Sequence, residues 1–130
     1  MMDVQKITCI NLYAKQSKRV LEQVLNSDKV ISTKTAQLTD IVESVLSVLL
    51  EHCDSLLTTD KLTVKEKRQL LGEARSCYNC IFQLNLLHFD NYIEKEAFND
   101  NADDISYVKK ELVKALVYLK RIILLTEEES

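Results

Sequence analysis

Proline is absent from the 130-residue chain, and glycine occurs once, at Gly72. A sheet protein of this length needs many tight turns, and turns draw heavily on these two residues. Their scarcity therefore argues against an all-β fold and favours a few long helices with short polar connections. Hydrophobic residues make up 46% of the chain and charged residues 28%, which is typical of a folded domain rather than a disordered one.

The chain also lacks segments that direct export or membrane insertion. Its start, MMDVQKITC, has no basic region followed by an apolar stretch, and no run of about 18 uncharged apolar residues occurs. We therefore expect no contact with a membrane. Four cysteines in a chain without an export signal are expected to be reduced thiols, which indicates a cytoplasmic protein.

Apolar residues recur at helical spacing in four segments, which predicts helices over residues 3–26, 33–57, 63–97 and 104–125. Thr63 and Glu66 form a capping-box pattern at the start of the third helix. That helix would be about 50 Å long, so we expect it to overhang the bundle or to kink around HFDNY (88–92). The acidic tail TEEES is expected to fray. The expected fold is a single-domain, all-α, antiparallel up-down four-helix bundle.

Each predicted helix has one apolar face that should point inward. The second helix is expected to be the most buried, because Leu46, Val48, Leu50 and Leu57 widen its stripe. The predicted inward residues are Ile7, Ile10, Ala14, Leu21, Val24 and Leu25 in the first helix; Leu38, Ile41, Val42, Val45, Leu49, Cys53 and Leu56 in the second; Leu70, Ala74, Cys77, Ile81 and Leu84 in the third; and Ile105, Val108, Leu112, Ala115, Leu119 and Ile122 in the fourth.

The segment GEARSCYNCIFQL (72–84) contains a Cys-x-x-Cys pair, Cys77 and Cys80. A structural zinc site needs four thiolate or imidazole ligands, and a redox pair sits at a helix N-terminus. Here both cysteines lie more than three turns inside a predicted helix. The other candidate ligands are Cys9, His52, Cys53 and His88, of which the last two fall about 15 Å away along the bundle. We therefore expect no metal site, with Cys77 in the core and Cys80 at its edge.

No pattern of an enzyme is present. His88 falls in the middle of the apolar face of the third helix and His52 flanks the core of the second, where a histidine usually has a structural role. There is no Glu-x-x-His pair, and one glycine cannot make a phosphate-binding loop. Asp100, Asp103 and Asp104 lie in a turn, where helix capping explains them. We expect no catalytic residue, no cofactor and no small-molecule substrate.

The third helix carries a polar face opposite Cys77, formed by Lys65, Arg68, Gly72, Arg75, Asn79 and Gln83. Basic residues early in a helix oppose its dipole, and a glycine in mid-helix costs about 1 kcal/mol relative to alanine. One interpretation is a solvated charged face with a tolerated glycine. The other is a contact surface, at which Gly72 lets a second subunit, a partner helix or a phosphate come close.

Two further basic lines accompany this face. They are Lys110, Lys114 and Arg121 in the fourth helix and Lys15, Lys18 and Arg19 in the first. The net charge of the chain is −3, so general polyanion binding is not indicated by charge alone. The three lines would form one electropositive surface if subunits assembled around them.

Residues 73–93, EARSCYNCIFQLNLLHFDNYI, resemble the third helix of a bacterial four-helix-bundle family first described from intervening sequences in 23S ribosomal RNA genes. The accessory proteins of diversity-generating retroelements are similar to this family. Its third helix carries a small residue pair, a Gln-Leu step and an aromatic-aliphatic end, matched here by Arg75-Ser76, Gln83-Leu84 and Tyr92-Ile93. The family's Ser-Ile-Pro-like segment is missing from the second helix, and the chain is acidic where the accessory proteins are basic.

The resemblance implies a non-enzymatic bundle that forms a ring-like homo-oligomer, a pentamer. In the retroelement accessory proteins, such a ring binds a reverse transcriptase and its RNA. An alternative hypothesis is a monomeric or dimeric protein-interaction module, such as a secretion chaperone, an immunity protein or a phage-encoded inhibitor, with no nucleic-acid role. Proteins of these classes are also small, acidic and helical.

Overall fold

The computed structural model describes residues 2–56, 62–89 and 102–127. Its elements are the helices α1 (Met2–Leu25), α2 (Thr33–Asp54) and α3 (Val64–Leu84), the π-helical turn η1 (Asn85–Phe89) that continues α3, and the helix α5 (Ala102–Thr126). The starts of these helices lie within two residues of the predicted ones. Residues 90–97 of the third predicted helix, Asp100 and most of the predicted frayed tail lie outside the described residues.

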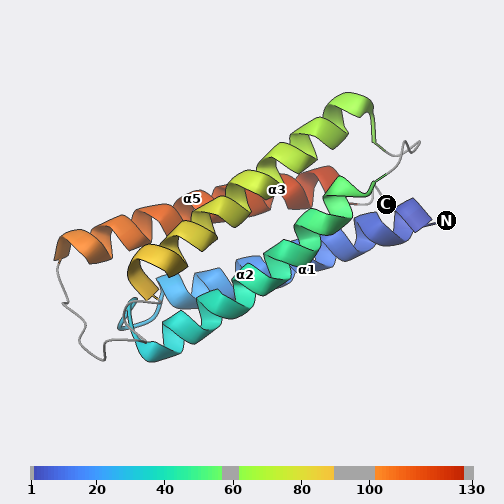
Figure 1. Ribbon diagram of the computed structural model, residues 1–130. Helices are drawn as coiled ribbons and strands as arrows, with labels where there is room; N and C mark the ends of the chain where they lie inside the picture. The colour runs from blue at the N-terminus through green and yellow to red at the C-terminus, as the bar shows by residue number, and fades with distance from the viewer. Residues whose placement is uncertain (1, 57–61, 90–101, 128–130) are drawn as a thin grey trace.

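The helices form an antiparallel bundle in which each packs against two neighbours, in the order α1, α2, α3, α5 and back to α1. Figure 1 shows α1 and α3 running in one direction and α2 and α5 in the other, so that α1 begins where α5 ends. The predicted all-α up-down four-helix bundle is therefore confirmed. The order around the bundle places α2 and α5 at diagonally opposite corners, with α5 between α1 and α3.

The core is a continuous apolar cluster contributed by all four helices. The predicted stripes of α1 and α5 are buried, except that Leu25 and Ile105 are half-buried. The predicted stripe of α3 is buried from Leu70 to Leu84, with Cys77 fully enclosed. Apolar periodicity thus located the inward face of three of the four helices.

The prediction for α2 was partly wrong. Ile41, expected to point inward, is 56% exposed, and Val48 is 41% exposed, whereas Leu46 is buried. The buried stripe includes Thr35 and Thr39, which an apolar pattern does not count. The Thr39 hydroxyl donates a hydrogen bond to the backbone oxygen of Thr35 at 3.0 Å, so this polar group is satisfied inside the helix.

Capping boxes fix the starts of α2 and α3. The predicted one is present: the Glu66 N–H donates to the Thr63 hydroxyl and the Thr63 N–H donates to Glu66 Oε1, each at 3.1 Å. A second box, which was not predicted, joins Ser32 and Thr35 at the start of α2. These side chains satisfy N–H groups that have no partner within a helix, and so they set where each helix begins.

The third predicted helix stays α-helical only to Leu84, and its geometry changes just before the predicted kink. A π-helical turn has more residues per turn than an α-helix, so the buried face shifts along the sequence by one position. Phe89 is therefore fully buried, while His88, predicted to lie in the middle of the apolar face, is half-buried. The His88 ring contacts Tyr107 of α5, with 5.2 Å between ring centroids.

The π-helical turn also buries Asn85, which is 1% exposed. Its Nδ2 donates to the backbone oxygen of Thr39 at 3.2 Å and to Glu43 Oε1 at 2.9 Å. Both acceptors belong to α2. This amide is thus a polar contact between η1 and α2 inside an otherwise apolar interface.

Candidate contact surfaces

The Cys-x-x-Cys pair packs against α5. Cys77 is fully buried and its thiol donates to the backbone oxygen of Ala115 at 3.7 Å, while Cys80 is 8% exposed beside Glu111. Burial, followed by the hydrogen bond with Glu111, raises the pKa of the Cys80 thiol to about 12. A thiol that stays protonated is a weak nucleophile. The pair therefore has the structural role predicted for Cys77.

The remaining candidate ligands are dispersed. His52 stacks on Tyr13 of α1 with 5.9 Å between ring centroids, and Cys53 is buried on the inward face of α2. Within the described part of the chain, no group of three or more histidine, cysteine, aspartate or glutamate side chains is arranged to hold a metal ion. The four cysteines are free thiols.

The polar face of α3 is exposed to solvent. Lys65, Arg68, Gly72, Arg75 and Asn79 all lie on its outward side, as predicted. A Cβ atom added to Gly72 would meet nothing within 4 Å, so contacts within the chain do not require a glycine there.

The basic line of α5 lies beside that of α3. Lys110, Lys114 and Arg121 are exposed, and Arg121 Nη1 lies 3.4 Å from Glu73 Oε1 of α3. Since α3 and α5 pack side by side, these two lines occupy one side of the bundle. We call this surface the α3–α5 basic face, and it consists of Lys65, Arg68, Arg75, Lys110, Lys114 and Arg121.

Of the acidic side chains described near this face, Glu73 and Glu111 are half-buried and Asp54 is exposed. Glu73 and Glu111 lie on the seam between α3 and α5. Asp54, at the end of α2, has its Oδ1 3.9 Å from Arg75 Nη2. Exposed ion pairs such as Arg75–Asp54 are worth less than about 1 kcal/mol, so Arg75 remains available to other anions.

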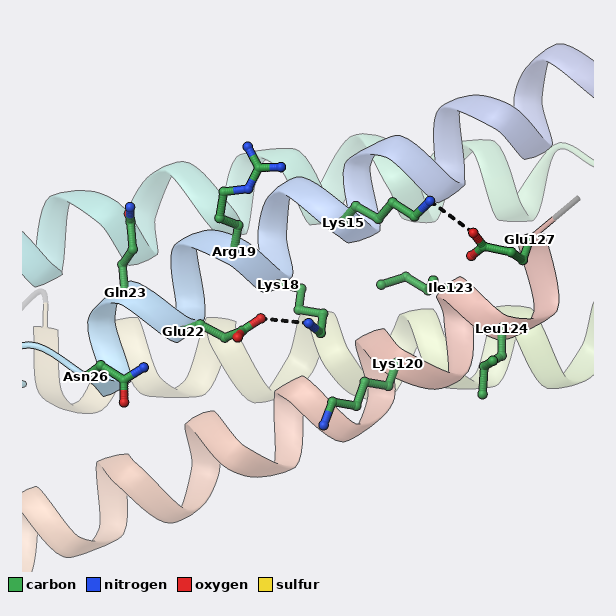
Figure 2. A pocket seen from close by; sticks show the side chains of 10 residues that line it. All are labelled: Lys15, Lys18, Arg19, Glu22, Gln23, Asn26, Lys120, Ile123, Leu124 and Glu127. Atoms are coloured by element: carbon green, nitrogen blue, oxygen red, sulfur yellow. Dashed lines mark hydrogen bonds and ion pairs between the residues drawn. The ribbon is translucent and has the colours of Figure 1, made fainter.

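The third basic line lies on the other side of α5. Lys15, Lys18 and Arg19 of α1 line an open groove between α1 and α5, which we call the α1–α5 groove (Figure 2). In the isolated chain, α5 thus separates this line from the α3–α5 basic face. The sequence alone indicated the three lines but not their order around the bundle.

The α1–α5 groove has a volume of about 880 Å³ and is both cationic and apolar. Lys15 Nζ lies 3.1 Å from Glu127 Oε1, and Lys18 Nζ lies 2.8 Å from Glu22 Oε1. The hydrogen bond from Lys18 holds the pKa of the Glu22 carboxyl below its usual range. Figure 2 shows both pairs, with Arg19 and Gln23 leaving α1 on the side away from α5. The groove is lined by Lys15, Lys18, Arg19, Glu22, Gln23, Asn26, Lys120, Ile123, Leu124 and Glu127.

Sequence reasoning missed the α5 side of this groove, which contains Lys120, Ile123 and Leu124. A signal was present in the run IILL (122–125), because four consecutive apolar residues cannot all face inward on a helix. Leu124 is the residue left outside and is 76% exposed. Val113 and Val117, at 48% and 40% exposure, add apolar surface to the outward side of α5.

Among the described residues, no helix combines the length and apolar character needed to cross a membrane. Comparison of the chain with protein families, curated proteins and solved structures finds no significant match. The resemblance to the bacterial four-helix-bundle family therefore stays a hypothesis, and the candidate surfaces are judged on their own chemistry.

Proposed function

We propose that this chain is a non-catalytic binding protein whose α3–α5 basic face contacts RNA. The observation that carries the proposal is the gathering of six exposed cationic side chains on one side of a protein whose net charge is −3. These six cations outnumber the acidic groups described near this face, so we expect its local potential to be positive. Such a face attracts phosphate backbones regardless of the overall charge.

The side chains of the α3–α5 basic face suit contact with the phosphate backbone of RNA rather than recognition of its bases. Lysine and arginine on the outward sides of two packed helices present their charges to solvent, where phosphates can reach them. Asn79 adds a side-chain amide on the same side. Gly72 lies among these residues and leaves the α3 backbone accessible, which would suit close approach of a phosphate or of a partner helix.

In its most concrete form, following the family resemblance, the chain is a cytoplasmic accessory subunit of a diversity-generating retroelement. It would assemble as a ring-like homo-oligomer, a pentamer, and bind a reverse transcriptase together with its RNA. It would need no cofactor and no catalytic residue. The four free thiols are in keeping with a reducing compartment.

A pair of charge-reversal variants with equal net charge tests the RNA contact. K65E/R68E changes the α3–α5 basic face, and K34E/K109E changes two exposed lysines outside it. We expect wild-type protein to shift a labelled single-stranded RNA in a gel assay. K65E/R68E should lower its affinity about tenfold or more and reduce the salt dependence by about two counterions, because each lysine or arginine contact releases about one.

The control K34E/K109E should retain most of the wild-type affinity. Equal losses in both variants would mean that only net charge matters, and they would overturn the assignment to the α3–α5 basic face. Absence of RNA binding by the wild type at low salt would overturn the RNA proposal itself.

The second candidate is a protein-interaction module with no nucleic-acid role. The exposed Val113, Val117 and Leu124 on α5 favour it, because apolar side chains at interface centres supply binding free energy that phosphates cannot exploit. This function predicts no RNA shift in the same assay.

A further inference from the structure

The outward side of α5 carries a row of apolar residues between two rows of cations. Val113, Val117 and Leu124 are 48%, 40% and 76% exposed. Because they are spaced by four and seven residues, they lie along one line of the helix, about 16 Å from end to end. We call this line the α5 row. Spacings of four and seven residues are those of the a and d positions through which one helix packs against another.

Cations lie on both sides of the α5 row. Lys109 borders the connection between α1 and α2, and Lys120 lines the α1–α5 groove, so both lie on the side toward α1. Lys110, Lys114 and Arg121 lie on the side toward α3, with which Arg121 forms an ion pair. All five side chains are exposed. They occupy the positions beside an apolar row that carry charged residues in paired helices.

Exposed acidic residues are absent from this part of α5. Between Ser106 and Leu124, a range that the structure describes completely, the one acidic residue is Glu111, and it is half-buried against α3. Glu73 of α3 offsets only the charge of Arg121. In a chain whose net charge is −3, five exposed cations around an apolar row favour a partner that is both apolar and acidic.

We infer that the α5 row docks a helix of another protein, namely an amphipathic helix whose apolar stripe is flanked by carboxylates. The apolar stripe of this partner covers Val113, Val117 and Leu124, and its glutamate or aspartate side chains pair with the cations on both sides. Burial of the apolar row supplies affinity. The two rows of charge select an acidic helix over a basic one and centre it on the row.

A helix suits the α5 row better than a lipid surface, an RNA or an extended peptide. A helix that lies on a membrane presents a broad apolar face rich in leucine and aromatic residues, whereas this row is one residue wide. Phosphates pair with lysine but gain nothing from Val113 and Val117. An extended peptide adds to a sheet edge with free backbone groups, which the interior of a helix such as α5 does not offer.

This inference rests on the second candidate function, a protein-interaction module, and names the chemistry of its partner. It does not depend on the RNA contact. Lys65, Arg68 and Arg75 belong neither to the α5 row nor to its flanks, and phosphates make no use of the apolar side chains. RNA binding and helix docking can therefore fail independently.

A designed helical peptide tests the docking. It is about four heptads long, with leucine at the a and d positions and glutamate at the e and g positions, where like charges oppose pairing of the peptide with itself. A control peptide has the same composition but distributes leucine around the helix. In a fluorescence anisotropy titration, we expect wild-type protein to bind the designed peptide about tenfold or more tightly than the control, because only the designed peptide can cover the α5 row.

Variants of the protein separate the apolar and charged contributions. V113S/V117S removes most of the α5 row and keeps every charge, and K114E/K120E reverses one cation on each side of it. Each should lower the affinity for the designed peptide about tenfold or more. V113S/V117S should retain RNA binding and cooperative thermal unfolding, which separates a lost contact from a lost fold.

Matched controls should bind the designed peptide like the wild type. R19E/K34E has the same net charge as K114E/K120E but changes exposed cations of α1 and α2. K65E/R68E should also keep peptide binding while losing RNA binding. Equal losses in R19E/K34E and K114E/K120E would mean that only net charge matters, and they would overturn the inference.

Three further results would also overturn it. The first is equal affinity of the wild type for the two peptides, or unchanged affinity in V113S/V117S. The second is binding to vesicles of phosphatidylserine and phosphatidylcholine without binding to the designed peptide, which would assign the α5 row to a lipid surface. The third is a fall in molar mass of the protein alone on introducing V113S/V117S, which would assign the row to a second copy of the chain.

Discussion

The Cys80 thiol of α3 lies 3.2 Å from the backbone oxygen and 3.3 Å from the Oε2 atom of Glu111 on α5. The Cys-x-x-Cys pair is the part of the sequence most like a metal or redox motif. One of its two thiols is therefore hydrogen-bonded across the interface between two helices. Burial and the neighbouring carboxylate both oppose ionisation of the thiol. The reactivity of the cysteine thiols therefore reports on how the helices of the bundle are packed.

Thiol labelling should distinguish Cys9 from the other three cysteines. Cys53, Cys77 and Cys80 are buried, whereas Cys9 is half-buried on α1. A thiol with a pKa of about 12, such as Cys80, is ionised to roughly one part in ten thousand at pH 8. We expect one cysteine per chain to react rapidly with a disulfide reagent in native protein, and all four to react in denaturant. Two or more fast-reacting cysteines in the native state would contradict the burial of Cys53, Cys77 and Cys80.

Stability should fall as the pH rises above about 9. Burial raises the pKa of the Cys53 thiol from 9.0 to about 12 and that of Cys77 in the same direction. The unfolded chain therefore releases protons at a lower pH than the folded one, so stabilisation by the neutral thiol is complete below pH 9 and is lost as pH approaches 12. We expect a loss of about 1 kcal/mol per buried thiol between pH 8 and pH 10.

Urea unfolding at these two pH values measures this loss, and the variant C53A provides the control. Lysine and tyrosine side chains titrate in both proteins, so only the cysteine contribution differs. C53A will be less stable at pH 8 because of its cavity, but its stability should decline less steeply with pH. Equal slopes in the two proteins would refute the role of Cys53.

Replacing Gly72 with alanine should stabilise the protein by about 1 kcal/mol, because the residue is exposed inside α3 and a Cβ atom there meets nothing. Thermal unfolding followed by circular dichroism gives this change. If Gly72 lets a partner approach the α3 backbone, G72A should bind RNA or a partner protein more weakly while melting at a higher temperature. Higher stability with unchanged binding would identify Gly72 as a tolerated glycine.

The sequence was most informative where one local interaction decides the structure. Thr63 and Glu66 were predicted to form a capping box, and both hydrogen bonds are present. Cys77 was placed in the core from its alignment with Leu70 and Ile81, and it is fully buried. These predictions depend on helical periodicity and on contacts three residues apart, which do not require knowledge of the tertiary structure.

Prediction failed where a polar residue or a change of helix type intervened. Thr39 occupies the buried face of α2 because its hydroxyl bonds within the helix, so Ile41 is turned outward. The π-helical turn moves the buried position from His88 to Phe89, and no sequence pattern indicated an added residue per turn. A prediction based only on the spacing of apolar residues cannot detect either effect.

The sequence predicted three separate lines of basic residues along the helices, and it did not predict which lines lie together on one surface. Exposure of Arg68, Lys114 and Lys15 followed from their spacing, but their grouping depends on which helices are neighbours. That order is a tertiary property, set by how four apolar stripes share one core. For the same reason Lys120 and Leu124 of the α1–α5 groove were not recognised.

The buried amide of Asn85 bears on how many arrangements the chain can adopt. Helices with long aliphatic stripes can slide along one another by a turn at little cost, since one leucine replaces another in the contact. Asn85 can satisfy its Nδ2 only opposite Thr39 and Glu43 of α2. A displacement of one turn would separate this amide from its present acceptors, and a buried Nδ2 group left without a partner costs about 1–3 kcal/mol. Asn85 thereby favours the observed axial alignment of α2 and α3.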